Sequence, residues 1–60
     1  MSAVYNPEAD VMAEIEKLEL DARNIRRRVE HARNEADKRV LNRQLAEIER
    51  QVEFLKQRLP

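Results

Sequence analysis

The chain has 60 residues, 40% of them charged, and its 12 basic side chains are balanced by 12 acidic ones. It contains no Cys and a single His, which excludes disulfides, thiolate metal sites and a His cluster for zinc. It also contains no Gly, which excludes the Gly-rich loops that cradle nucleotide phosphates. A lone core is marginal at this size, so association with other helices is the remaining means of stabilisation.

The composition is typical of a helical protein without a membrane span. Ala, Leu, Glu and Arg, which are strong helix formers, dominate the sequence. No apolar run approaches the roughly 18 residues that cross a bilayer. Residues 1–5 lack the basic and apolar stretches of a secretory signal. We therefore expect an all-α protein in the cytoplasm, with no membrane partner.

The first predicted helix begins at a clear signal near residue 7. Asn6 can cap a helix, and Pro7 suits the first helical position. The acidic Glu8 and Asp10 would interact favourably with the positive end of the helix dipole. We predict a helix over about residues 7–33, preceded by a loose N-terminal segment over 1–6. Residues 7–60 are expected to form a single domain.

Apolar residues recur along the chain at alternating spacings of four and three, which is typical of a seam between packed helices. The first seam lies in the first helix and comprises Val11, Ile15, Leu18, Ala22, Ile25 and Val29. The second seam predicts a helix over about residues 38–59 and comprises Leu41, Leu45, Ile48, Val52, Leu55 and Leu59. These twelve residues are the predicted helix-packing interface.

The two seams are out of phase, which indicates a break between them. On one straight helix the second stripe would lie about 130° around the axis from the first. Asn34 can adopt the left-handed conformation that ends a helix, and Asp37 can cap the next one. We therefore predict an antiparallel two-helix hairpin. The alternative is one long helix in a coiled-coil dimer, because Gly and Pro are absent near residue 35 and two antiparallel rods would pair the same residues.

Leu20 and Phe54 point away from the main stripes, and Met12 lies near the edge of one. They form a possible secondary interface, because a hairpin usually needs a further layer of helix to hide its apolar surface. We predict that they meet a second hairpin and that the chain forms a homodimeric four-helix bundle. In length, helix number and seams the chain resembles the small α-hairpin proteins that dimerise in this way. That resemblance implies a fold and carries over no functional residues.

Charge is unevenly distributed along the sequence. Residues 1–22 hold one basic and six acidic side chains, a net charge of −5, whereas residues 23–43 hold eight basic and three acidic ones, a net charge of +5. Residues 44–60 are balanced. In a hairpin the turn end would be positive. Two hairpins with turns at opposite ends would bring acidic and basic regions together.

The functional interpretation is a non-enzymatic helix-packing interaction or assembly module, which forms homo-oligomers or docks on a helical protein partner. A first alternative is a small RNA- or DNA-binding regulator, since phosphate contacts need only positioned cations. Its candidate contacts lie near the turn and are Arg23, Arg26, Arg27, Arg33, Lys38 and Arg39. The neutral net charge favours a solvated arginine face instead. A second alternative, tied to the continuous helix, is a coiled-coil spacer.

The residues offer little for catalysis. Ser2 and Tyr5 are the only hydroxyl side chains, and both fall in the N-terminal segment. His31 has Arg28 three residues before it, so the Glu-x-x-His pattern of bundle metal sites is missing. We therefore expect no enzyme activity, no metal, no cofactor and no small-molecule substrate.

Overall fold

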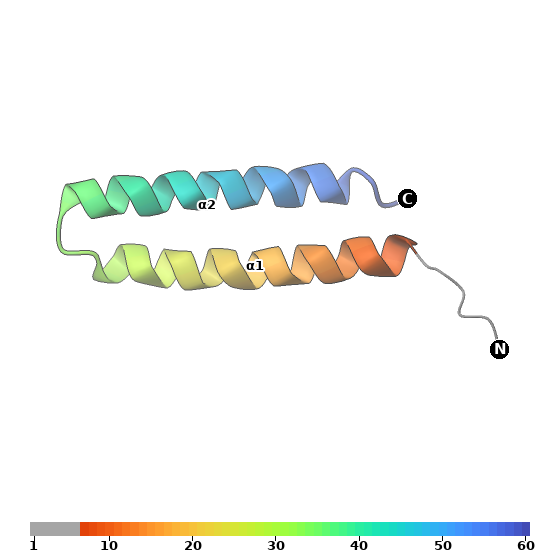
Figure 1. Cartoon of the computed structure of the whole chain (residues 1–60), viewed down its shortest axis with the longest axis horizontal. Coiled ribbons are helices and arrows are strands. Elements are labelled where there is room, and N and C mark those ends of the chain that lie inside the picture. The colour runs from red at the N-terminus through yellow and green to blue at the C-terminus, as the bar shows by residue number, and fades with distance from the viewer. Residues whose placement is uncertain (1–6) are drawn as a thin grey trace.

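The computed structural model describes residues 7–60, which form an all-α helical hairpin. Helix α1 spans Pro7–His31 and helix α2 spans Glu35–Lys56. The two helices run antiparallel and pack against each other (Figure 1). The predicted hairpin is confirmed. The alternative of one continuous helix is wrong, because residues 32–34 leave helical geometry and the chain reverses there.

Pro7 begins α1, as its fixed backbone angle and missing N–H predict. The predicted loose segment 1–6, with the proposed cap Asn6 and the hydroxyl side chains of Ser2 and Tyr5, lies outside the described residues. At its other end α1 stops at His31, two residues earlier than predicted. The Ala32 N–H donates to the Val29 carbonyl at 3.2 Å, a three-residue bond that tightens the last turn.

Helix α2 begins at Glu35, three residues earlier than predicted, because Asn34 rather than Asp37 is its cap. Asn34 is extended, with φ −141° and ψ 161°, and its side chain accepts a hydrogen bond from the Asp37 N–H at 2.8 Å. The predicted left-handed Asn34 and capping Asp37 are both wrong: over residues 7–60 no backbone φ is positive, and Asp37 lies inside the first turn of α2. A carboxylate there still favours the helix, because it faces the positive end of the dipole.

Helix α2 ends at Lys56, before the predicted residue 59. Beyond it the Arg58 N–H donates to the Leu55 carbonyl at 3.0 Å and the Leu59 N–H donates to the Lys56 carbonyl at 3.2 Å. These three-residue bonds satisfy carbonyls that the end of a helix would otherwise leave unpaired. Leu59 lies past the helix end and is half-buried.

The core is a single strip between α1 and α2. Three described residues are buried: Ile15, Ala22 and Val52, with exposed fractions of 7%, 4% and 8%. The other nine residues of the two seams are half-buried, and no described side chain is completely enclosed. Each helix contributes one apolar stripe, so the hairpin is a layer one helix thick.

Candidate helix-packing interface

All twelve seam residues are buried or half-buried in the hairpin, so the structure brings the two predicted stripes together. Because the layer is one helix thick, this strip can be reached from two opposite faces. The two faces differ in the side chains that flank the seam. That difference determines where another helix could pack.

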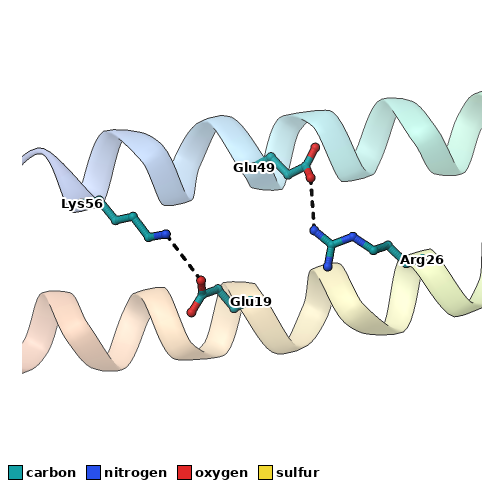
Figure 2. A network of polar contacts seen from close by, with 4 residues as sticks. All are labelled: Glu19, Arg26, Glu49 and Lys56. Atoms are coloured by element: carbon teal, nitrogen blue, oxygen red, sulfur yellow. Dashed lines mark hydrogen bonds and ion pairs between the residues drawn. The ribbon is translucent and has the colours of Figure 1, made fainter.

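One face, which we call the salt-bridge face, is crossed by two ion pairs between the helices. Arg26 Nη2 lies 3.2 Å from Glu49 Oε2, and Lys56 Nζ lies 3.7 Å from Glu19 Oε2 (Figure 2). Glu19 lies seven residues before Arg26 on α1, and Lys56 lies seven residues after Glu49 on α2. The two pairs are therefore one heptad apart on each helix. All four side chains are about half exposed, between 50% and 55%, so each pair contributes only about 0–1 kcal/mol.

A shallow groove between these ion pairs has Ala22 and Val52 at its base. Both residues are buried. The long side chains of Arg26, Glu49 and Lys56 border the same groove, and their alkyl portions cover apolar surface while the charged ends remain in water. On the salt-bridge face, these long side chains therefore cover part of the seam.

The opposite face, which we call the open face, has three shallow grooves in a row. They are lined by the half-buried seam residues Leu18, Ile25, Leu41, Ile48 and Leu55. Helix α2 borders these grooves with uncharged Gln44 and Gln51 and with apolar Val40 and Phe54. Charged side chains line the same grooves: Glu14, Asp21 and Arg28 from α1, and Asp37 and Arg50 from α2. The two ion pairs that join residues 10–31 of α1 to α2 lie on the salt-bridge face. The open face thus leaves its part of the seam half-exposed.

The predicted secondary interface is divided among different sides of the hairpin. Met12, Leu20 and Phe54 are exposed by 52%, 53% and 61%. Phe54 lies on the open face. Met12 precedes Glu19 by seven residues and so lies on the salt-bridge side. Leu20 is two residues from both Leu18 and Ala22, about 200° around α1 from each of them, and therefore points away from α2. The three residues cannot form one continuous patch within a chain.

Sequence reasoning missed Val40, which is 55% exposed on the open face. The signal was present in the spacing, because Val40 precedes Phe54 by fourteen residues, which is two heptads. Residues two heptads apart occupy the same side of a helix. Val40 and Phe54 are therefore the apolar pair that flanks the seam on this face.

The six cations near the turn are only partly available to other ligands. Arg26 is paired with Glu49, and Lys38 Nζ lies 3.6 Å from Glu35 Oε1. Arg23 borders the groove on the salt-bridge face. The others, Arg27, Arg33 and Arg39, are exposed. Carboxylates within reach of two of these cations reduce the positive charge that a phosphate backbone would meet.

In residues 7–60 no group of three or more His, Asp or Glu side chains is placed to hold a metal ion. Neither described helix is long and apolar enough to cross a membrane.

No family model matches the chain, and no curated protein or solved structure matches it significantly. His31 is exposed and borders a groove of the open face beside Arg28.

Proposed function

We propose that this chain is a non-enzymatic interaction module that works by packing its hairpin against further helices. The observation that supports this proposal is the incomplete core. Nine of the twelve seam residues remain half-exposed, and four large apolar side chains are more than half exposed: Met12, Leu20, Val40 and Phe54. A layer of helix on one face of the hairpin would bury part of this surface, including the exposed side of the seam on that face.

The small size of the hairpin limits the stability that it can reach alone. Ordering a residue costs roughly 1–2 kcal/mol of backbone entropy, and a small domain offsets that cost mainly by burying apolar surface. Here three residues are buried, the ion pairs between the helices are exposed, and the sequence has no Cys for a disulfide. Natural scaffolds of this size add disulfides, a metal or a partner chain, and the partner chain is the device that we propose here.

Thermal unfolding of the purified chain across a wide concentration range tests this proposal. We expect the midpoint, followed by far-UV circular dichroism, to rise with protein concentration, because a partner that binds only the folded state stabilises it by mass action. Light scattering should give a mass above that of one chain at micromolar concentration. A fully helical monomer with a concentration-independent midpoint would contradict the proposal. A chain that is unfolded when alone would point to docking on a different helical protein.

A further inference from the structure

We infer that the partner is a second copy of this chain, seated on the open face with the two turns at opposite ends. This inference rests on the proposed function and adds to it a face, an orientation and a register. The face follows from burial. Both seam residues at the base of the salt-bridge groove, Ala22 and Val52, are buried, whereas the five seam residues that line the open-face grooves are all half-exposed.

The chemistry of the open face also suits a helix partner. Uncharged Gln44 and Gln51 lie beside the seam where the salt-bridge face has Glu49 and Lys56. At these two positions a second helix would bury no unpaired charge, which is costly at the centre of an interface. Glutamine amides on two facing helices can both donate and accept hydrogen bonds across such a contact.

The orientation follows from symmetry and charge. When two layers pack face to face with opposed turns, α1 lies antiparallel to the second α1, and α2 lies antiparallel to the second α2. In α1, residues 7–22 carry a net charge of −5 and residues 23–31 a net charge of +3, so each acidic half of α1 meets a basic half. Residues 23–43, which include the turn, carry +5. Turns at the same end would set the two +5 regions side by side. Complementary potentials favour the opposed arrangement.

The register follows from the apolar pair. Val40 and Phe54 lie symmetrically about Glu47, so a two-fold axis that crosses α2 near Glu47 places Val40 of each copy beside Phe54 of the other. The axis also brings the two Glu47 carboxylates near each other, and Arg50 Nη2 of the same chain lies 2.6 Å from each Glu47 Oε2 and offsets its charge. The same axis places Gln44 beside Gln51 of the second copy. Each apolar side chain that the hairpin leaves exposed on this face thus gains an apolar neighbour.

Helix α1 fits the same axis. One groove of the open face contains Asn24 and Ile25 of α1 together with Ile48 of α2, so the axis crosses α1 near Asn24. Asp21 and Arg28 border that groove and lie on either side of Asn24. The axis therefore places Asp21 of each copy opposite Arg28 of the other, an ion pair formed twice.

The face is tested by two matched truncations, with the dissociation constant measured by sedimentation equilibrium. Phe54→Ala should weaken the dimer by about tenfold or more, since it removes a large apolar side chain from the interface. Leu20→Ala is the control, because Leu20 is 53% exposed on the side of α1 turned away from α2. It should change the constant by less than about threefold. Equal effects of the two variants would overturn the assignment of the face.

The orientation is tested by disulfide formation, because the chain has no Cys of its own. Gln44→Cys chains mixed with Gln51→Cys chains should form a mixed disulfide in a glutathione redox buffer. A disulfide needs the two Cα atoms within about 7 Å, and residues 44 and 51 of one helix are about 10 Å apart. Turns at the same end would instead join Gln51→Cys to Asp21→Cys, and that product would overturn the inference.

The outcomes separate this inference from the proposed function. A concentration-dependent midpoint without the mixed disulfide would leave the interaction module in place and reject this dimer. A chain that is unfolded when alone would do the same. A stable helical monomer would reject both.

Discussion

At the scale of single residues, Asn34 and Asp37 define where α2 begins. The Asp37 N–H donates to Asn34 Oδ1 at 2.8 Å, and Asn34 Nδ2 donates to Asp37 Oδ2 at 3.1 Å. The first bond satisfies one of the four N–H groups that the start of a helix leaves unpaired. The second holds the amide in the orientation that the first requires. Two short polar side chains therefore direct the chain out of the reversal and into α2.

The cap can be tested by comparing two substitutions at one position. Asn34→Ala should lower the free energy of unfolding by about 1 kcal/mol, whereas Asn34→Gly should lower it by only a few tenths, because Gly is tolerated as a cap. Chemical denaturation of the three proteins at one protein concentration measures the difference. Ala and Gly variants of equal stability would show that the Asn34 side chain contributes nothing.

The sequence identified both residues of this pair but assigned the cap of α2 to Asp37 instead of Asn34. Asn and Asp are each good caps, and each tolerates a turn, so local preference alone does not rank Asn34 against Asp37. Only the path of the chain between the packed helices decides which residue is extended. That path depends on contacts between α1 and α2, which no local signal contains.

At the scale of the helices, the alternating spacing of apolar residues predicted both elements, and the phase difference between the two seams favoured their pairing in a hairpin. The degree of burial was not. Val52 is buried and Leu55 is half-buried, although both occupy the second seam. The difference arises from the flanking side chains, because the long ion-paired residues cover one face and leave the other open. Helix ends were also displaced by two or three residues, as three-residue bonds replaced the last turns.

The strip between the helices can be tested with one buried and one exposed position of α2. Val52→Asp should abolish cooperative unfolding or lower the free energy of unfolding by several kcal/mol, because a carboxylate would be buried without a partner. Ala46→Asp is the control, since Ala46 is exposed on α2. It should cost about 0.7 kcal/mol, the difference in helix propensity. Full helicity and unchanged mass for Val52→Asp would contradict the position of the core.

At the scale of the whole molecule, the connection over residues 32–34 need only reverse the chain. Ala32 donates to Val29, and Asn34 caps α2, but no described backbone position there requires Gly. The absence of Gly from the sequence therefore poses no obstacle to a hairpin. The sequence could not exclude a rod, because a turn made by ordinary residues has no distinctive composition.

A Gly-Ser insertion between Ala32 and Arg33 tests this view of the connection. Doubling the length of a loop costs only about 0.6 kcal/mol, so four added residues should lower the free energy of unfolding by about 1 kcal/mol and preserve helicity. The same insertion between Leu20 and Asp21 interrupts α1 and should shift its two halves out of register. Equal losses of unfolding free energy from the two insertions would contradict the view that the connection need only reverse the chain.

The reversal beside Asn34 also has a consequence for the order of folding. Seam residues next to the connection, such as Val29 and Leu41, are close in sequence, whereas Val11 and Leu59 lie near opposite ends of the chain. Closing a short loop costs less entropy than closing a long one, so contacts near the reversal form first and each later contact closes only a small further loop. Such a chain zips from its turn toward its ends. The residues that set its folding speed are therefore those beside the reversal, even though the buried residues Ile15 and Val52 lie farther along the helices.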